Sequence, residues 1–352
     1  MAHALRLAEK GLYSTSPNPR VGCVLVRDDK VVGSGWHERA GGHHAEINAL
    51  AAAGPAARGA TAYLTLEPCN HHGRTPPCAE ALINAGIAKL LTAMQDPNPL
   101  VAGAGLASLK EAGIEVQTGL MEAEAKALNI GFVARMTRNR PWVRIKIAAS
   151  LDGKTALNNG TSQWVTGEAA RHDGHRLRAR SCAVLTGIGT VLADDPQLTV
   201  RHVKTSRQPL RVVVDSRLDI PVDARLLRGG GELVFTATAS EGKIGALQDV
   251  GARAIVLPDL NDNVDLAGMM RMLADFEINE VLVEAGWRLN GSLINAGLVD
   301  EIVFYLAPYL IGNAARDMVK LPELTDLADK RVLNIQDVRA VGTDIRVTSR
   351  FS

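Results

Sequence analysis

A histidine and two cysteines lie close enough in the sequence to hold one metal ion. His44 opens the stretch, and Cys69 and Cys78 follow it. An imidazole and two thiolates suit zinc, and three protein ligands leave the fourth tetrahedral position open for water, as in catalytic sites. Zinc lowers the pKa of such a water to about 7, so hydroxide is available at neutral pH. These residues predict one hydrolytic zinc site per chain.

Glu46 lies two residues after the histidine, at the expected start of a helix. This spacing aims the carboxylate at the bound water, whose proton it can take and later deliver to a leaving amine. Such general acid–base work is worth ~10²–10⁴ in rate. His-x-Glu followed by Pro-Cys and a further Cys is typical of zinc deaminases acting on nucleobase-like rings. The commonest second half is Pro-Cys-x-x-Cys, whereas eight residues separate Cys69 from Cys78 here.

Other interpretations of this stretch remain open at the level of sequence. The metal site can be structural, or Cys69 and Cys78 can form a disulfide. Retention of a glutamate beside only three ligands favours the catalytic interpretation. The spacing also leaves open a fourth protein ligand from His43, His71 or His72.

Longer strings around these residues resemble a known family. Thr65-Leu66-Glu67-Pro68-Cys69, Thr75-Pro76-Pro77-Cys78, Pro17-Asn18-Pro19-Arg20-Val21-Gly22 and Gln95-Asp96-Pro97-Asn98-Pro99 are similar to the deaminase half of the bifunctional riboflavin-biosynthesis deaminase–reductases. The resemblance implies a cytidine-deaminase-like α/β/α fold. It also implies that the Asn18 amide contacts the pyrimidine, although Asn between prolines is equally typical of a turn.

Length and composition agree with a two-domain enzyme. The chain has 352 residues, 46% of them hydrophobic and 22% charged, as in ordinary globular proteins. A formal net charge of +1 gives no electrostatic footprint for nucleic acid or membrane. Cys23 and Cys182, in apolar surroundings, are predicted to be small buried residues. We expect a reducing, cytoplasmic location, with no signal peptide and no membrane span.

Strands and helices are predicted to alternate in the first domain. The expected helices are 5–12, 44–53, 78–85, 106–112 and 121–138, and the expected strands are 21–26, 31–34, 61–66 and 88–94. His44 and Cys78 then lie at helix N-termini, which converge on one ion in a layered α/β arrangement. Arg138-Asn139-Arg140-Pro141 ends the domain, so the predicted domains are 1–141 and 142–352.

The second domain is predicted to be α/β with a mainly parallel sheet. The expected strands are 142–149, 183–186, 210–214, 233–236, 254–257, 281–284 and 302–307, and the expected helices are 269–276 and 289–296. Gly187-Ile188-Gly189-Thr190 begins like a phosphate-binding loop, but Leu192 stands where the third glycine of the dinucleotide fingerprint belongs. A plain strand-to-helix turn explains this loop equally well.

The second half resembles the reductase half of the same family. The similar strings are Lys146–Lys154, Ser162–Thr166, Gly189–Pro196, Leu198–Arg201 and Val283–Gly286. The resemblance implies a dihydrofolate-reductase-like fold that uses NADPH. It implies that the cofactor contacts Ala148, Trp164, Thr190, Asp194, Ser216, Gly286, Trp287, Arg288, Leu289, Asn290, Gly291 and Ser292, and the substrate Ser162, Arg178, Leu198, Arg201 and Glu284.

Physical chemistry supports several of these assignments, and each has a simpler alternative. Arg178 and Arg201 are forked donors suited to a phosphate. Arg176, Arg178 and Arg180 can instead form a solvated helix face. Trp164 can be mostly core, and Asp194 only part of a turn. No residue stands out as the proton donor, and Lys146 is a weak candidate.

The resemblance implies two sequential reactions on small molecules. The first is hydrolytic deamination of 2,5-diamino-6-(5-phosphoribosylamino)pyrimidin-4(3H)-one, and the second is NADPH-dependent reduction of the ribosyl chain of 5-amino-6-(5-phosphoribosylamino)uracil to the ribityl form. A homo-oligomer formed through the reductase domain is compatible with the sequence. A nucleic-acid base deaminase is disfavoured by the neutral charge and the 4% aromatic content. A zinc-stabilised binding protein is disfavoured by Glu46.

Overall fold

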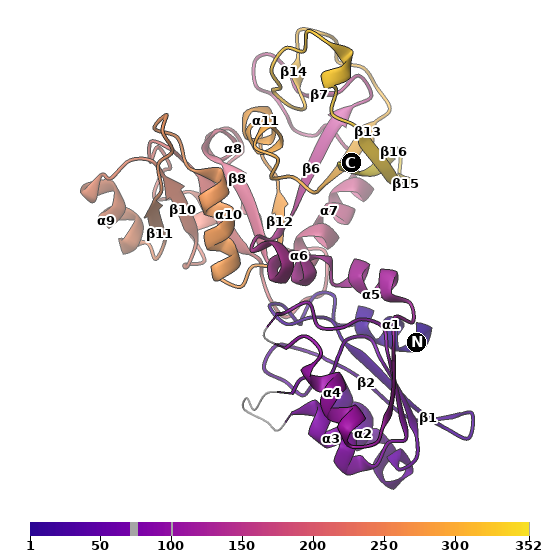
Figure 1. The fold of residues 1–352 in the computed structure, drawn as a ribbon. Coiled ribbons are helices and arrows are strands. Elements are labelled where there is room, and N and C mark those ends of the chain that lie inside the picture. The colour runs from indigo at the N-terminus through magenta and orange to yellow at the C-terminus, as the bar shows by residue number, and fades with distance from the viewer. Residues whose placement is uncertain (71–76, 100, 352) are drawn as a thin grey trace. The chain divides into compact units, whose positions relative to one another are not determined.

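The structure is a computed structural model that describes residues 1–70, 77–99 and 101–351 (Figure 1). It divides into two compact units, Met1–Arg140 and Pro141–Ser352, and each is described by itself. Four residues singled out by the sequence, namely His71, His72, Thr75 and Pro76, lie outside the described set. Both units are layered α/β structures, so the predicted fold class is confirmed.

The first unit is built on a five-stranded sheet with the order β2-β1-β3-β4-β5. Strands β1 and β2 form an antiparallel hairpin, β1 is antiparallel to β3, and β3, β4 and β5 run parallel. The elements are α1 Ala2–Glu9, β1 Gly22–Arg27, β2 Lys30–Trp36, α2 Ala45–Ala53, β3 Thr61–Leu64, α3 Cys78–Ala85, β4 Lys89–Thr92, α4 Ala104–Glu111, β5 Glu115–Thr118, α5 Glu122–Leu128 and α6 Ile130–Arg138.

Alternation along β1 places helices on both faces of this sheet, since successive side chains of a strand point to opposite sides. Cys23 and Leu25 pack with the side chains of α2, α3 and α4, whereas Val24 packs with α1. The alanine-rich helix α2 approaches β2 very closely. A Cβ at Gly33 would lie 2.4 Å from the Ala49 carbonyl oxygen, so only glycine fits there. This close contact fixes the helix whose first turn carries the predicted metal ligand and acid–base residues.

The predicted single helix over 121–138 is wrong, because the structure breaks it at Asn129. Asn129 leaves the helical conformation, with φ −105° and ψ 24°, between α5 and α6. Its side-chain amide accepts from the Arg20 N–H at 2.8 Å and donates to the Arg20 carbonyl at 2.9 Å. Helical periodicity continues across this position, so only the tertiary contact reveals the break.

The second unit is built on a nine-stranded sheet with the order β11-β10-β9-β8-β12-β6-β13-β16-β15. Pairing is parallel from β11 through β13 and antiparallel where β16 and β15 join, so the predicted mainly parallel sheet is confirmed. Its strands are β6 Trp142–Ser150, β8 Ala183–Gly187, β9 Leu210–Val214, β10 Leu233–Thr236, β11 Arg253–Val256, β12 Glu280–Val283, β13 Glu301–Ala307, β15 Leu333–Val341 and β16 Asp344–Phe351.

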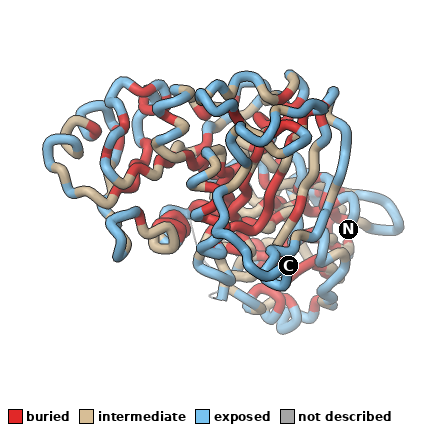
Figure 2. The backbone as a smooth tube through the Cα atoms, turned by 90° about the horizontal axis from the view of Figure 1, so that it is seen from above, coloured by how far each residue is buried: buried red, intermediate tan, exposed pale blue. Residues whose placement is uncertain are grey.

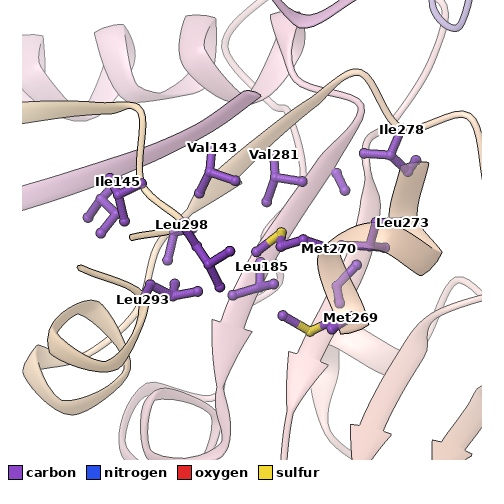
Figure 3. Close-up of a cluster of buried hydrophobic side chains, with 14 of the residues drawn as sticks. Val143, Ile145, Leu185, Met269, Met270, Leu273, Ile278, Val281, Leu293 and Leu298 are labelled. Carbon is purple, nitrogen blue, oxygen red and sulfur yellow. The ribbon is translucent and has the colours of Figure 1, made fainter. Parts of the chain in front are cut away.

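Helices follow the parallel strands, as crossover connections require. They are α7 Glu168–Arg180, α8 Ile188–Asp194, α9 Glu241–Asp249, α10 Leu266–Asp275 and α11 Trp287–Asn295, and a short pair of β7 Lys154–Ala156 and β14 Arg316–Asp317 lies apart from the main sheet. The main core packs strand residues such as Val143, Leu185 and Val281 against α10 and α11 (Figure 3). Figure 2 shows the buried stretches inside the molecule and the exposed stretches along its loops and periphery.

The predictions missed the strand β5, the C-terminal hairpin of β15 and β16 and the helix α9. β15 is an edge strand, most of whose residues are exposed, so its sequence lacks the apolar run used to recognise buried strands. α9 contains two glycines and buries only Leu247. Cys23 and Cys182 are buried, as predicted, and no disulfide joins any of the four cysteines, all of which lie in the described part of the chain. In the described part of the chain, no helix combines the length and apolar character needed to cross a bilayer.

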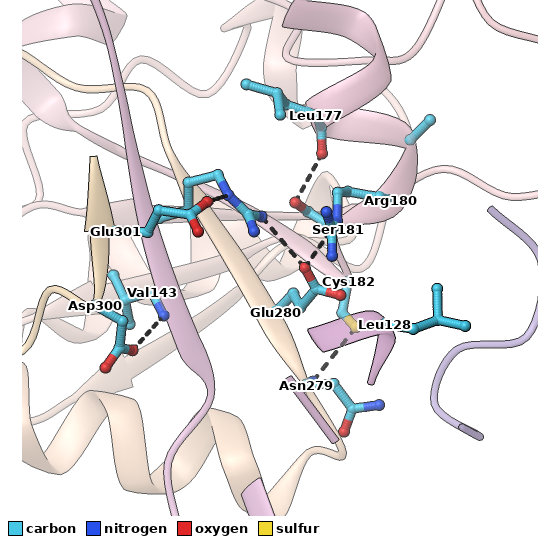
Figure 4. A network of polar contacts seen from close by, with 12 residues as sticks. Leu128, Val143, Leu177, Arg180, Ser181, Cys182, Asn279, Glu280, Asp300 and Glu301 are labelled. Carbon is cyan, nitrogen blue, oxygen red and sulfur yellow. Dashed lines mark hydrogen bonds and ion pairs between the residues drawn. The ribbon is translucent and has the colours of Figure 1, made fainter. Parts of the chain in front are cut away.

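A buried charge network lies near the amino ends of the central strands (Figure 4). The Arg144 side chain on β6 is ion-paired with Glu280 at 3.2 Å and with Glu301, at the first residues of β12 and β13. Arg180 reaches the same Glu280 carboxylate at 3.0 Å. The side chains of Arg144, Glu280 and Glu301 are at most 6% exposed.

Candidate active sites

Two helix starts and one loop bring the predicted zinc ligands together. His44 is the N-cap of α2, Cys78 is the first residue of α3, and Cys69 lies in the loop after β3. His44 Nδ1 lies 3.2 Å from Cys78 Sγ and 3.7 Å from Cys69 Sγ. All three ligand atoms lie within 4.8 Å of one another, the only such group of possible metal ligands among the described residues.

This geometry fits zinc. Bonds of about 2.1 Å to nitrogen and 2.3 Å to sulfur in a tetrahedron separate the ligand atoms by roughly 3.6–3.8 Å. The 3.7 Å from His44 Nδ1 to Cys69 Sγ lies in that range, and the 3.2 Å to Cys78 Sγ is about 0.4 Å shorter. The Cys78 main-chain N–H also donates to Cys69 Sγ at 3.4 Å, a contact that favours a thiolate at this position.

The two thiols are strongly coupled. The hydrogen bond from Cys78, together with the His44 ring, lowers the pKa of Cys69 to about 4. The same sulfur contact and burial raise the pKa of Cys78 far above its ordinary value. The contact between the two sulfurs therefore favours a thiolate at Cys69 and opposes a second one at Cys78. A divalent ion would supply the positive charge needed for both thiolates.

Glu46 lies in the first turn of α2 and is 3% exposed. Burial raises the pKa of its carboxyl to about 7, against the opposing influence of its own main-chain N–H and the nearby His44 ring. The Cys78 thiol also interacts with this carboxyl, so it lies beside the ligand cluster. A carboxyl that titrates near neutral pH is well matched to both accepting and donating a proton.

His37 is a neighbour of this site that the sequence did not reveal. Its ring packs edge-on against His44 at 5.5 Å between centroids. Its Nδ1 lies 3.0 Å from the His43 carbonyl oxygen, which can only accept, so Nδ1 carries the proton. Its Nε2 lies 3.1 Å from Asn18 Nδ2. Asn18 is thereby tied to the site, whereas no spacing rule distinguishes His37 from an ordinary loop histidine.

The second unit brings most of the predicted substrate residues together around one ion pair. Arg178 on α7 forms a forked contact with the Glu284 carboxylate just after β12, with one bond of 3.0 Å. Arg178 also donates to the Thr199 carbonyl at 3.0 Å. The Arg178 charge holds the pKa of Glu284 at about 2 despite burial. Lys146 on β6 adds a further cation whose own pKa is lowered by burial.

Arg201 is the most open of these cations. Its guanidinium donates to Gln197 Oε1 at 3.1 Å and Thr199 Oγ1 at 3.2 Å, both neutral oxygens. Burial and the charges of Arg178 and Arg225 lower the pKa of Arg201, so an added anion would relieve this repulsion. Leu198 as a whole residue is only 3% exposed and packs with core side chains of α7, β12 and β13.

His175 supports this segment and was missed from the sequence. It is 5% exposed, and its Nδ1 accepts from the Arg201 main-chain N–H at 3.2 Å. Burial and the neighbouring charges of Arg178, Arg201 and His202 lower its pKa to about 4, so it is neutral at pH 7. The available signal was its position three residues before Arg178 on one helix face.

The predicted cofactor residues lie where β6, β8, β9 and β12 end and the following helices begin. Ser162 Oγ donates to Asp194 Oδ1 at 3.1 Å, which joins a predicted substrate residue to a predicted cofactor residue. Thr190 in α8 lies beside Gly286, since a Cβ there would be 3.9 Å from Thr190 Oγ1. Ser216 follows β9, where its hydroxyl accepts from the Val264 N–H at 3.3 Å. Ala148 is half-buried in β6.

Trp164 is 70% exposed, so the alternative that it belongs to the core is wrong. The Arg171 guanidinium lies 4.7 Å from the centre of its ring. The alternative that Arg176, Arg178 and Arg180 form a solvated helix face is also wrong for two of the three. Arg176 is exposed, but Arg178 and Arg180 are ion-paired with glutamates. The Gly187 loop is a strand-to-helix turn between β8 and α8, as its simpler interpretation predicted.

Two glycines after β8 and β12 present main chain that neighbouring side chains do not crowd. A Cβ at Gly189 would meet nothing within 4 Å, and one at Gly286 only Thr190 Oγ1. In open parallel sheets, ligands bind outside the carboxyl ends of the strands. Farther along the segment Asn290 donates to the Ala285 carbonyl at 3.2 Å, and Gly291 packs on the Lys320 main chain. The start of α11, at Gly286, is thus uncrowded, whereas Asn290 and Gly291 farther along the helix are held by neighbouring main chain.

Comparisons with known proteins cover both units. Residues 1–94 match the model of the cytidine and deoxycytidylate deaminase zinc-binding region, and residues 141–347 match that of the RibD C-terminal domain. The chain is 47% identical to the riboflavin biosynthesis protein RibD of Escherichia coli, over 98% of this chain and 96% of that protein. It is 46% identical to the Haemophilus influenzae protein of the same name, over 99% and 95%.

Solved structures give the same result. Acinetobacter baumannii RibD matches with a TM-score of 0.93 and 44% identity, over 100% of this chain and 97% of that one. A diaminohydroxyphosphoribosylaminopyrimidine deaminase/5-amino-6-(5-phosphoribosylamino)uracil reductase from Thermotoga maritima matches with a TM-score of 0.88 and 33% identity, over 100% and 97%.

Proposed function

The chain belongs to the RibD family of riboflavin-biosynthesis enzymes, and from this premise we propose how its two sites divide the work. It is a bifunctional deaminase and reductase. We assign deamination of 2,5-diamino-6-(5-phosphoribosylamino)pyrimidin-4(3H)-one to residues 1–141. We assign reduction of the ribosyl chain of 5-amino-6-(5-phosphoribosylamino)uracil to residues 142–352.

In the deaminase site His44, Cys69 and Cys78 would hold one zinc ion. Zinc supplies a water of lowered pKa, about 7, at its open position. Glu46 takes a proton from the attacking water and delivers it to the departing ammonia. Its burial serves this exchange, because a carboxyl with a pKa of about 7 both gains and loses protons readily near neutral pH. Asn18, held by His37, contacts the pyrimidine ring.

In the reductase site NADPH supplies the hydride that reduces C1′ of the opened ribose. We assign the cofactor to Ala148, Trp164, Thr190, Asp194 and Ser216, together with the segment from Gly286 to Ser292. The open glycine positions and the exposed ring of Trp164 support this assignment. Asn290 and Gly291 hold the segment in place.

The substrate is assigned to Ser162, Arg178, Leu198, Arg201 and Glu284. Arg201, with only neutral oxygens around its guanidinium, suits the phosphate. The Glu284 carboxylate, kept ionised by Arg178, accepts from ribose hydroxyls or ring amines. Lys146, which is buried and interacts electrostatically with Glu284, is our candidate for the proton donor to the opened sugar. The absence of a disulfide among the four cysteines supports a reducing, cytoplasmic location. A homo-oligomer formed through the reductase unit stays a prediction.

The observation that carries this proposal is the buried Glu46 beside a cluster of three zinc-type ligands. Glu46→Ala removes the proton carrier, so ammonia release should fall by about 10²–10⁴. NADPH oxidation on the already deaminated substrate should be unchanged. The matched control is Glu111→Ala, an exposed glutamate of the same unit. Unchanged ammonia release would contradict the role of Glu46 as proton carrier. Equal loss of both activities would contradict two independent sites.

A further inference from the structure

One buried carboxylate connects the Cys69 loop to helix α4. Glu67, two residues before the ligand, is 3% exposed. Its carboxylate accepts from four main-chain N–H groups, those of Asp96, Gly103 and Gly105 at 3.0 Å and that of Leu106 at 3.3 Å. These donors belong to the start of α4 and the segment before it. The N-terminal N–H groups of a helix have no partner within the helix, so they favour an anion here.

Two further contacts join the same segments on either side of the cysteine. Gly105 lies against Pro68, since a Cβ at this glycine would be 2.0 Å from the Pro68 carbonyl oxygen. Asn70 Nδ2 donates to the Ala104 carbonyl at 3.3 Å. Residues 67, 68 and 70 are thus all held by the first turn of α4. The chain between them, which carries the thiol, has little freedom to move.

The side chain at position 67 must satisfy four donors at once. A carboxylate has about four lone-pair sites and no hydrogen, so it can accept all four bonds. An amide of the same shape has one acceptor oxygen, and its NH₂ group would face two of the N–H donors. Buried donors without partners cost about 1–3 kcal/mol each, so the loop would shift to satisfy them.

We propose that Glu67 is a positioning residue of the zinc site, which fixes the Cys69 thiol at ligand distance by fastening its loop to α4. The proposal rests on the zinc site assigned above. Glu67 itself does not reach the metal or the substrate. It acts by holding Cys69 Sγ 3.7 Å from His44 Nδ1 before the ion arrives, so that binding requires little rearrangement. Residues that orient the ligands of a metal ion typically contribute about 10–100-fold to metal affinity.

The test is zinc affinity, measured by competition with a chromophoric chelator. The temperature is kept well below the unfolding temperature of the metal-free chain. Glu67→Gln keeps the size of the side chain and removes half of its acceptors. It should weaken zinc binding about 10–100-fold and speed zinc release, with deaminase kcat largely restored at saturating zinc. The matched control is Glu111→Gln at the exposed end of α4, which should bind zinc like the parent chain.

Gly105→Ala tests the same attachment of the Cys69 loop to α4 without altering the Glu67 carboxylate. Its new Cβ would displace the Pro68 carbonyl, so zinc binding should weaken in this variant as well. This variant also decides the matter if Glu67→Gln does not fold. Unchanged zinc affinity in the folded variants, even with a lowered unfolding temperature, would overturn the proposal. Failure of the parent chain to bind one zinc would instead contradict the proposed deaminase site.

Discussion

Two clusters in the second unit both pair arginine with carboxylates, but they lie at opposite ends of the parallel strands. Arg144 pairs with Glu280 and Glu301 near the amino ends of the strands, and its side chain is 3% exposed. Arg178 pairs with Glu284 at the carboxyl ends, and its side chain is 15% exposed. Ligands bind at the carboxyl ends of such sheets. Burial of an ion pair therefore does not identify a functional site, whereas its position along the strands does.

The surroundings of the two clusters sharpen this contrast. The Arg178 pair lies beside Lys146 and the open Arg201, and these cations are not neutralised by the single Glu284 carboxylate. Such a positive excess suits a phosphorylated substrate. In the Arg144 cluster the two carboxylates, Glu280 and Glu301, pair with Arg144 and also with Arg180 and Arg350, which is an arrangement for structure.

Arg144→Met gives the largest expected effect on stability. It removes the guanidinium that pairs with both Glu280 and Glu301 and leaves them the more exposed Arg180 and Arg350, which should lower the free energy of unfolding of the reductase unit by about 3 kcal/mol. Urea denaturation of the full chain, with NADPH oxidation as the probe of this unit, measures the change. Arg339→Met, at an exposed pair, is the control and should leave the unfolding midpoint unchanged. If the free energy of unfolding falls no further than in this control, the structural role of the Arg144 cluster is contradicted.

Arg178→Met should act on catalysis more than on folding. Because Arg178 holds Glu284 and we assign both to the substrate, kcat/KM for the deaminated substrate should fall by about 100-fold, or about 2.7 kcal/mol. Ammonia release should not change. The matched control is the exposed neighbour Arg176→Met. A variant that unfolds at room temperature, or one with unchanged kcat/KM, would place Arg178 with the structural arginines.

His175 predicts a smaller, pH-dependent effect. Its pKa of about 4 in the folded chain lies below the ordinary 6.5, so it contributes stability above pH 6.5. That contribution is lost as the pH falls from 6.5 towards 4, because the unfolded chain binds the proton first. The facing groups Arg178, Arg201 and His202 oppose protonation, and Glu284 favours it.

His175→Asn removes this titration while keeping an acceptor for the Arg201 N–H. Chemical denaturation of both proteins at pH 7.5, 6.0 and 5.0 should show a smaller acid loss in the variant. Parallel losses in the two proteins would mean that His175 is protonated as easily when folded as when unfolded.

The sequence was most informative where function is local. The metal ligands and Glu46 lie within 35 residues, and glycine and proline mark the helix that begins at Cys78 and ends before Gly86. The reductase residues come instead from several strand ends spread over residues 148–292. Resemblance named them, but no spacing showed that Arg178 meets Glu284 or that Ser162 meets Asp194.

Tertiary contacts account for the predictions that failed. The break at Asn129 depends on its bonds to Arg20, which is 109 residues away in the chain. The roles of Glu67 and His175 depend on main-chain N–H groups of other segments. Backbone donors carry no sequence signature, so a side chain that serves them is visible only in three dimensions.

The zinc site is tested most directly by following metal content and both activities during chelator treatment of the purified chain. We predict one zinc per chain at the start, and ammonia release that falls in proportion to zinc removed and returns when zinc is restored. NADPH oxidation on the deaminated substrate should stay constant throughout. Ammonia release that persists in metal-free protein would contradict the account.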